Sequence, residues 1–376
     1  MDYEFNEQQQ MLKKSARDFL TTNCPPSLVK EMEEDEKGYS SVLWQQIAEL
    51  GWTGLIVPEK YGGSDGDFLD LMVLIEEMGR ALTPVPFFST VILGGLVLIE
   101  AGDEAQKQNY LPRLVDGNLI LSLALTEPEG GWSPASIRMP ATTDKDDYIL
   151  DGTKLFIENA NMADYLICAA RTSDSIEGGI SLFLVDAKDP NIKYTLLKTI
   201  AKDKQYEVVF DKVKVPKQNV IGEIGNGWSV LEKVLAKAAI AKSIEMVGGM
   251  QQSLEMTTEY AKQRVQFERP IGSFQAVQHH CANMLIATEG SRWLAYKTAW
   301  LASEGFPYLK EAYMTKAWVS DAYQQVARLG VQVHGGLGIM KEHEMQLYFR
   351  RAKSAEVILG DPDFYREKVA VELFDL

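Results

Sequence analysis

The chain has 376 residues, of which 46% are hydrophobic and 24% are charged, proportions that exclude a mainly disordered, collagen-like or small disulfide-rich protein. At roughly 100–200 residues per domain, this length predicts two or three domains. The formal net charge of −15 argues against a nucleic-acid partner, because nucleic-acid-binding proteins contact phosphates through Lys and Arg, and any anionic ligand would need a local cluster of positive charge.

The N-terminal part of the chain has the pattern of helices. Apolar residues recur at near-helical spacing over residues 43–52 and again over residues 69–82. Between them, Pro58, Gly62 and Gly63 mark a loop, because proline and paired glycines interrupt regular structure. We therefore expect an N-terminal helical domain over residues 1–117.

From about residue 118 the pattern changes to short runs that are rich in strand-forming residues. Asp-Gly, Gly-Gly and Asp-Pro pairs separate these runs, as expected for tight turns. The runs are residues 119–125, 148–150, 155–157, 165–169, 180–185 and 206–215. This spacing predicts a compact middle domain, an antiparallel β-sandwich or barrel, over residues 118–226.

The helical period returns after a glycine-rich loop and continues to the end of the sequence. The helical segments are residues 228–260, 274–303, 308–330 and 342–359. Residues 227–376 are therefore expected to form a C-terminal helical domain that packs against the N-terminal one. The predicted fold class is α+β, with helices, then a sheet domain, then helices.

The residue pattern does not favour metal binding or secretion. The cysteines are Cys24, Cys168 and Cys281. They are far apart and odd in number, so we expect reduced thiols and neither disulfides nor metal ligands. The adjacent His279 and His280 would point about 100° apart on a helix and could not share an ion. The N-terminal segment is not a signal peptide, and the longest strongly apolar run, residues 91–99, is about half of a membrane span. We predict no metal, no membrane span and a cytoplasmic location.

Three segments have unusual chemistry. Residues 125–132 follow a strand and end in a glycine-rich loop, which could expose backbone N–H groups to a planar or anionic ligand or be an ordinary turn. Arg264 and Arg269 lie beside a helix break, where they could bind a pyrophosphate or form a salt-bridged helix end. Residues 332–338 place glycines after a long helix, either as a C-cap or as a point of close approach for a phosphate.

Taken together, in this order and at these separations, the three segments resemble the acyl-CoA dehydrogenase family. The resemblance extends nearly from end to end of the chain. Further matching segments are residues 51–63, Glu76-Glu77-Met78-Gly79-Arg80, Asp151-Gly152-Thr153-Lys154 and Val213-Lys214-Val215-Pro216. The resemblance implies the family's fold, with a C-terminal four-helix bundle, and an FAD cofactor between the middle domain and the C-terminal helices.

The resemblance also implies which residues bind FAD. Those near the isoalloxazine ring would be Leu125, Thr126, Phe156 and Glu158. Those at the pyrophosphate and adenine half would be Arg264, Gln266, Phe267 and Phe274. Those that contact the FAD of a neighbouring subunit would be Gln332, Gly335 and Gly336. In the family, a base removes the α-proton of an acyl-CoA thioester while a hydride passes from the β-carbon to the flavin, and the electrons usually leave to an electron-transferring flavoprotein.

The sequence departs from the family at the catalytic base. In many members a glutamate directly precedes a Gly-Thr pair after the last long helix, and here that place is occupied by Leu359, before Gly360. The family's other common base falls at about Ala238. Neither side chain can accept a proton. In addition, Glu158 replaces a threonine beside the ring, where a carboxylate would disfavour the reduced anionic flavin.

Three interpretations of this departure are open. Residues 360–366 resemble the tail of heteromeric members that act on steroid side chains or on dicarboxylic or alicyclic acyl-CoA esters, and we favour a base-lacking subunit of such a heterotetramer, with a role in lipid or alicyclic acid degradation. Alternatively, a self-sufficient enzyme, such as a homotetramer, would use Asp361 as a displaced base, although Asp361 before Pro362 also fits a helix N-cap. The third interpretation is a non-catalytic flavin-binding or interface subunit.

Overall fold

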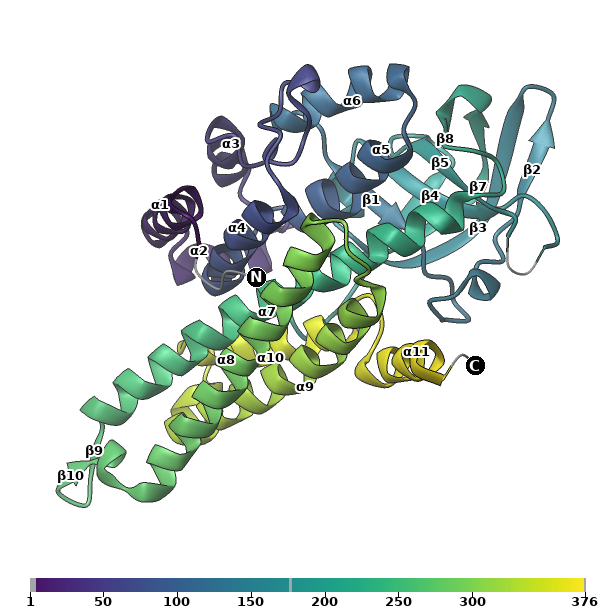
Figure 1. The fold of residues 1–376 in the computed structure, drawn as a ribbon. Coiled ribbons are helices and arrows are strands. Elements are labelled where there is room, and N and C mark those ends of the chain that lie inside the picture. Colours follow the sequence, from purple (N-terminus) through teal and green to yellow (C-terminus); the bar gives the residue numbers. More distant parts are fainter. Residues whose placement is uncertain (1–4, 176–177, 375–376) are drawn as a thin grey trace. The chain divides into compact units, whose positions relative to one another are not determined.

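The computed structural model describes residues 5–175 and 178–374 and divides into two compact units (Figure 1). The first, called the bundle unit below, consists of Met1–Lys30, Asp67–Thr83 and Ala239–Leu376. The second, called the sheet unit, consists of Glu31–Gly66 and Pro84–Ala238. The bundle unit is thus assembled from segments that are far apart in the sequence, whereas only residues 67–83 separate the two segments of the sheet unit.

The sheet unit contains two four-stranded sheets. In the first, the strand order is β1 (Leu121–Ala124), β4 (Tyr165–Arg171), β5 (Ile180–Asp186) and β8 (Val220–Ile221). In the second, it is β2 (Ala141–Asp144), β3 (Asp147–Glu158), β7 (Gln205–Pro216) and β6 (Ile192–Leu197). All pairings in these two sheets are antiparallel except that of β1 with β4, which is parallel.

The two sheets share one apolar core, as in a β-sandwich. Leu166 and Phe183 of the first sheet cluster with Leu150, Val208 and Phe210 of the second, and all five are fully buried. The edge strand β1 packs against a buried π-helical segment, η2 (Phe88–Gly95), and the Thr90 hydroxyl group of η2 hydrogen-bonds the Leu121 backbone. This segment contains most of the longest apolar run of the sequence, which is thus part of the buried core.

Short helices complete the sheet unit. They are the end of α2 (Pro26–Glu34), α3 (Ser41–Glu49), η1 (Glu59–Tyr61), α5 (Leu96–Ala101), α6 (Glu104–Val115), η3 (Pro134–Ser136), η4 (Ala160–Met162), η5 (Lys217–Asn219) and the first turns of α7 (Gly227–Gln263). Helices α3 and α6 begin at side-chain N-caps, Ser40 and Asp103. Asp103, for example, accepts a hydrogen bond from the Gln106 N–H at 2.7 Å in a capping box.

The bundle unit is built around long helices that run side by side in Figure 1. These are α7 from Ala239 onward, α8 (Gln275–Ser303), α9 (Leu309–His334) and α10 (Met345–Val357). The N-terminal helices α1 (Glu7–Asn23) and α4 (Phe68–Ala81) and the last helix, α11 (Pro362–Phe374), join them. Helix α9 packs against α8, α10 and α11, so it lies at the centre of this unit.

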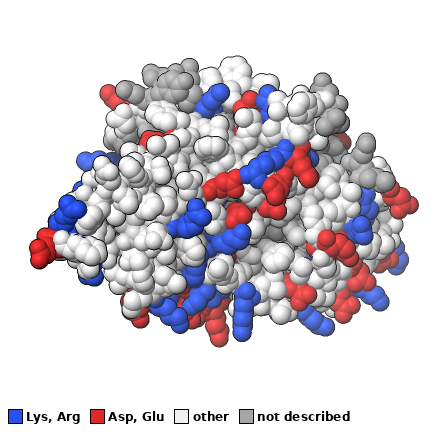
Figure 2. Space-filling view, turned by 90° about the horizontal axis from the view of Figure 1, so that it is seen from below, with Lys and Arg blue, Asp and Glu red and all other residues white. Residues whose placement is uncertain are grey.

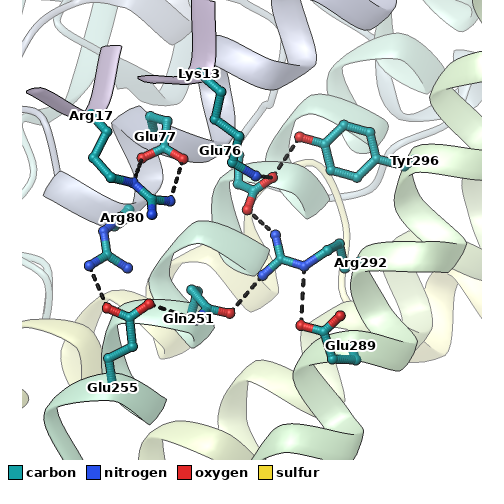
Figure 3. A network of polar contacts seen from close by, with 10 residues as sticks. All are labelled: Lys13, Arg17, Glu76, Glu77, Arg80, Gln251, Glu255, Glu289, Arg292 and Tyr296. Carbon is teal, nitrogen blue, oxygen red and sulfur yellow. Dashed lines mark hydrogen bonds and ion pairs between the residues drawn. The ribbon is translucent and has the colours of Figure 1, made fainter. Parts of the chain in front are cut away.

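The segment Glu76-Glu77-Met78-Gly79-Arg80 on α4 is explained by packing in the bundle unit. Glu76 is 2% exposed and accepts hydrogen bonds from Tyr296 Oη at 2.6 Å, from Lys13 Nζ at 3.2 Å and from Arg292 (Figure 3). Burial by itself raises the pKa of Glu76, but the charges of Arg292 and Lys13 bring it below the ordinary value. The carboxylate is therefore ionised and fully paired.

The neighbouring residues extend this network to further helices. Arg17 of α1 binds the buried Glu77 through two hydrogen bonds of 2.9 and 2.7 Å, and Arg80 pairs with Glu255 of α7 at 2.5 Å. Glycine is required at position 79, because a Cβ there would lie 2.1 Å from the Glu245 carbonyl oxygen of α7. The motif thus joins α1, α4, α7 and α8, as Figure 3 shows, and its role is structural.

These elements confirm the predicted fold class of an N-terminal helical part, a middle sheet domain and C-terminal helices. The runs 148–150 and 155–157 are parts of one long strand, β3. Strands β2 and β6 were not predicted from the sequence, because most of their side chains are exposed or half-buried. On the face drawn in Figure 2, Lys and Arg side chains alternate with Asp and Glu side chains. No helix in the described part of the chain combines the length and the hydropathy that crossing a membrane requires.

Candidate active site

The loop that follows β1, residues 125–127, is fixed by strand β3 of the same unit. Lys154 Nζ donates hydrogen bonds to the Leu125 carbonyl oxygen at 3.1 Å and to Glu127 Oε1 at 2.7 Å. The Leu155 N–H donates to the Thr126 carbonyl oxygen at 2.8 Å. We call residues 125–127 the β1 loop.

The carboxylate of Glu127 is a buried anchor of the β1 loop. It is 5% exposed, and its partner Lys154 is fully buried. Besides the lysine, it accepts from the backbone N–H of Arg138 at 2.9 Å and of Met139 at 3.0 Å. A buried charge needs this degree of pairing, because an isolated one would be strongly destabilising.

The β1 loop has its acceptors satisfied and some of its donors free. Among the residues that the structure describes, no acceptor faces the N–H of Thr126, the N–H of Glu127 or the Thr126 hydroxyl group, although both residues are more than nine-tenths buried. Buried backbone donors are nearly always paired in folded proteins. A ligand that offers hydrogen-bond acceptors would satisfy them.

Strand β3 places Phe156 beside the β1 loop with an unusual backbone. Phe156 has φ of +57° at a register shift between β3 and β7, and its side chain is 56% exposed. Positive φ in a bulky residue is uncommon and strained. Glu158 ends the strand, and its carbonyl oxygen accepts from Ser122 Oγ of β1 at 2.7 Å. The residues predicted to lie near the flavin ring thus follow β1 (Leu125 and Thr126) or belong to β3 (Phe156 and Glu158).

In the bundle unit, the connection between α7 and α8 is a small hairpin of β9 (Val265–Gln266) and β10 (Arg269–Pro270), followed by η6 (Ile271–Ser273). Phe267 and Glu268 form its two-residue turn, and both have positive φ, as in a type I′ turn. Phe267 is 86% exposed, and its ring meets Phe274 edge-on at 6.0 Å.

The hairpin carries two arginines. Arg264 is exposed and forms no ion pair with any residue in the described part of the chain. The Arg269 guanidinium lies 4.2 Å from the centre of the Phe274 ring, a cation–π contact. Uncompensated arginines in a chain of net charge −15 are suited to bind phosphate.

The C-terminal end of α9 lies at the same end of the bundle unit, because His334 stacks on Tyr260 of α7 at 4.4 Å. Gln332 is exposed, and Gly335 has φ of +64°. A Cβ added at Gly335 or Gly336 would meet no atom within 4 Å. These glycines leave open space at the surface, which would permit close approach of a ligand or a neighbouring subunit.

A cavity of about 520 Å³ at this end of the bundle does not suit an anion. Its lining includes Glu255, Glu259, Glu342, Glu344, His334 and His343. Burial lowers the pKa of both histidines, so they do not offset the carboxylates at neutral pH. In the described ranges, no three His, Cys, Asp or Glu side chains are arranged to hold a metal ion.

The expected base position is on the short connection between α10 and α11. Leu359 is 6% exposed and has φ of +65°, and Ala238 on α7 is fully buried. Asp361 is exposed, and its Oδ1 accepts from the Phe364 N–H at 2.8 Å. This is the hydrogen bond of an N-cap, which Pro362 at the first helical position completes.

Comparison with known proteins identifies the family. Sequence models of the acyl-CoA dehydrogenase N-terminal, middle and C-terminal domains match residues 6–118, 122–213 and 225–374. The chain belongs to the acyl-CoA dehydrogenase family. It is therefore an oxidoreductase, and its cofactor is FAD, because the members of this family are FAD-dependent flavoproteins.

Individual relatives cover nearly the whole chain. It is 32% identical to the caffeyl-CoA reductase–Etf complex subunit CarC of Acetobacterium woodii, over 95% of both chains. The structure of butyryl-CoA dehydrogenase from Megasphaera elsdenii matches with a TM-score of 0.92 and 32% identity, over 99% of this chain and 100% of that one. A steroid acyl-CoA dehydrogenase structure, whose name joins Tcur3481 to Tcur3483, matches with a TM-score of 0.88 and 29% identity over 98% of both chains.

The residues present in this acyl-CoA dehydrogenase fit FAD. The free donors of the β1 loop match the acceptor atoms of a flavin ring, and the unpaired Arg264 matches a pyrophosphate. Sequence reasoning missed Lys154 and Glu127 as anchors of that loop. Lys154 lies between the predicted runs 148–150 and 155–157 and follows Asp151, Gly152 and Thr153, so the sequence pattern did not indicate that it is buried.

Proposed function

We propose that this chain is the base-lacking, FAD-binding subunit of a heteromeric acyl-CoA dehydrogenase. The observation that carries the proposal is Leu359, because an alkyl side chain occupies the position from which the α-proton of the substrate would be removed. Ala238, at the other common base position, is equally inert. A second homologous subunit, in a heterotetramer, would then supply the complete proton-abstracting site.

In this proposal each unit carries residues that would contact FAD. The β1 loop would donate hydrogen bonds to the ring from Thr126 and Glu127, beside Phe156 and Glu158. The hairpin would bind the pyrophosphate and adenine half through Arg264, and with it Gln266, Phe267 and Phe274. Gln332, Gly335 and Gly336 would contact the FAD of a neighbouring subunit. When bound, FAD supplies the acceptor for the hydride that leaves the β-carbon of the acyl-CoA.

Asp361 is the alternative base in a self-sufficient enzyme, for example a homotetramer. Its carboxylate already accepts the N-cap hydrogen bond of α11, which supports a structural role and the base-lacking interpretation. A non-catalytic flavin-binding or interface subunit is the third outcome that the test below distinguishes.

The relatives support a substrate class and two partners. The steroid enzyme, whose name joins two components, supports a bulky acyl-CoA ester as substrate and a heteromeric assembly, with a role in lipid or alicyclic acid degradation. The CarC subunit of an Etf complex supports an electron-transferring flavoprotein as electron acceptor. The cytoplasmic location stays a prediction from the sequence.

The test is the visible spectrum of the FAD-loaded chain, alone, before and after anaerobic addition of straight-chain and alicyclic acyl-CoA esters. We expect an oxidised flavin that shifts its absorption on ligand binding but does not bleach. Addition of the homologous partner subunit should then permit bleaching. The variant Asp361→Asn should behave like the unchanged chain, since asparagine is an equally good N-cap.

Bleaching in the chain alone that Asp361→Asn abolishes would overturn the base-lacking proposal in favour of the displaced base. A flavin that neither shifts with any ester nor bleaches with the partner present would identify a non-catalytic subunit. Failure of the purified chain to bind FAD at all, with or without the partner, would overturn the whole assignment of the site.

A further inference from the structure

The connection between α10 and α11 is fixed by a buried lysine on a third helix. Lys316 of α9 is fully buried, and its Nζ donates to the carbonyl oxygens of Ala355 at 3.1 Å, Glu356 at 2.9 Å and Gly360 at 3.2 Å. The first two oxygens belong to the last turn of α10, where carbonyls lack partners within the helix. One amine therefore joins the end of α10 to the residue after Leu359.

A buried tyrosine holds the residue in between. Tyr365 of α11 is 3% exposed, and its hydroxyl donates to the Leu359 carbonyl oxygen at 2.7 Å. Its own N–H donates to the Asp361 carbonyl oxygen at 3.2 Å. Its ring centre lies 5.6 Å from Lys316 Nζ. Lys316 and Tyr365 thus bind successive carbonyl oxygens, those of Leu359 and Gly360.

These contacts maintain a strained backbone. Leu359 has φ of +65° and Gly360 has φ of +114°, and a leucine in the left-handed region is unfavourable because of its Cβ. A Cβ added at Gly360 would lie 2.6 Å from the Phe364 ring, so glycine is required there. Strain of this kind persists only where the surroundings over-determine the conformation, and it concentrates at functional sites.

None of these hydrogen bonds involves the side chain of residue 359. We infer that Lys316 and Tyr365 are positioning residues, which keep the backbone of residue 359 in one conformation whatever side chain it carries. This inference rests on the proposed function for one point only, that residue 359 is the position from which a base would reach the substrate. In that case the chain lacks the catalytic group but has kept the backbone contacts that would orient it.

The first test measures the backbone directly, by hydrogen exchange of the amides of residues 359–361 in the FAD-loaded chain. The variant Tyr365→Phe removes the hydrogen bond to Leu359 and keeps the ring. The matched control is Tyr348→Phe on α10, which removes a 2.7 Å hydrogen bond from another buried tyrosine to the Arg80 carbonyl oxygen. We expect exchange to be about tenfold faster in Tyr365→Phe, the effect of one buried hydrogen bond, and unchanged in the control.

The second test asks whether the fixed backbone positions a catalytic group. The variant Leu359→Glu should bind FAD and acyl-CoA and bleach the flavin without a partner, whereas Leu359→Gln, of equal size, should not. Adding Tyr365→Phe to Leu359→Glu should slow bleaching about tenfold, by the same loss of one buried hydrogen bond, with FAD content unchanged. Adding Tyr348→Phe should leave the bleaching rate as it was.

The outcomes of these two tests distinguish a failure of this inference from a failure of the proposed function. Equal exchange rates in the two tyrosine variants, or equal slowing of bleaching by both, would overturn the positioning role. Suppose instead that exchange differs as expected while Leu359→Glu binds FAD and acyl-CoA without bleaching. The positioning of the backbone would then stand, and the placement of residue 359 next to the substrate, which belongs to the proposed function, would be wrong.

Discussion

Two lysines with fully buried side chains hold two loops of this protein, one in each unit. Lys154 binds the β1 loop of the sheet unit through the Leu125 carbonyl oxygen and the carboxylate of Glu127. Lys316 binds the α10–α11 connection of the bundle unit through three carbonyl oxygens and the Ser320 hydroxyl group. Lys154 has an opposite charge within hydrogen-bond distance, whereas Lys316 has none among the residues that the structure describes.

This difference changes what each lysine does to the folded state. Lys154 and Glu127 form an ion pair in which each charge needs the other. For Lys316, burial and the charge of Lys242 lower the pKa to about 7, against the opposing influence of Glu356 and Asp361. A loop can thus be fixed by a buried ion pair or by an amine whose partners are backbone carbonyl oxygens and whose pKa is lowered to about 7. The two solutions differ in how they respond to mutation and to pH.

The largest effect is expected from removing the lysine of the ion pair. Lys154→Met leaves the Glu127 carboxylate buried without its counter-charge and should lower the free energy of unfolding by about 3–5 kcal/mol. Lys316→Met leaves only neutral carbonyl oxygens unpaired and should cost about 1–3 kcal/mol. Denaturant unfolding checks both values, with Lys193→Met, at an exposed position of β6, as the control. The reverse order of the two losses would contradict the comparison.

The pH dependence of stability should distinguish the two lysines next. The folded-state pKa of Lys316, about 7, lies below the ordinary lysine value of 10.5, so between these values the unfolded chain binds more protons. The free energy of unfolding of the unchanged chain should therefore rise, relative to Lys316→Met, as the pH increases from about 7 toward 10.5, and the difference should be constant below pH 7. Denaturant midpoints at pH 6, 7.5 and 9 measure it, and parallel curves for the two proteins would refute it.

The smallest effect on stability is expected from removing the N-cap of α11, Asp361, in the α10–α11 connection. Asp361→Ala removes the hydrogen bond to the Phe364 N–H and should lower the free energy of unfolding by about 1 kcal/mol, whereas Asp361→Asn should cost only a few tenths. Thermal unfolding of both variants checks this prediction. Equal losses in the two variants would mean that the charge of Asp361, and not its capping hydrogen bond, stabilises the connection.

The long helices and most strands were predictable because their periodicity depends on local burial alone. The segments 274–303 and 206–215 correspond to α8 and β7 within a few residues. The edge strand β6 was not predictable, since five of its six side chains are exposed or half-buried. The π-helical segment η2 depends on packing against β1, which the sequence pattern does not contain.

The candidate site was predictable as a set of segments but not as a set of contacts. The glycines and arginines stand out by residue type, whereas Lys154 and Lys316 look like ordinary surface charges in a linear sequence. One signal was available for Lys316, because it lies on the same helical face as Ala312, Tyr313 and Val319, which are all buried. A lysine at the centre of an apolar face indicates a buried amine with backbone partners.

The interleaving of the two units has a consequence for synthesis of the chain on the ribosome. Glu76 of α4 is buried against Arg292, which lies 216 residues later in the sequence. The N-terminal helices of the bundle unit are therefore synthesised long before the helices against which they pack. The sheet unit is complete at Ala238. It can fold before the remaining helices of the bundle unit are synthesised, since domains fold as units during translation. A nascent chain that stops before α8 would therefore lack Arg292 and Tyr296, two of the three side chains that donate hydrogen bonds to Glu76, whereas Arg17, the partner of Glu77, is already present.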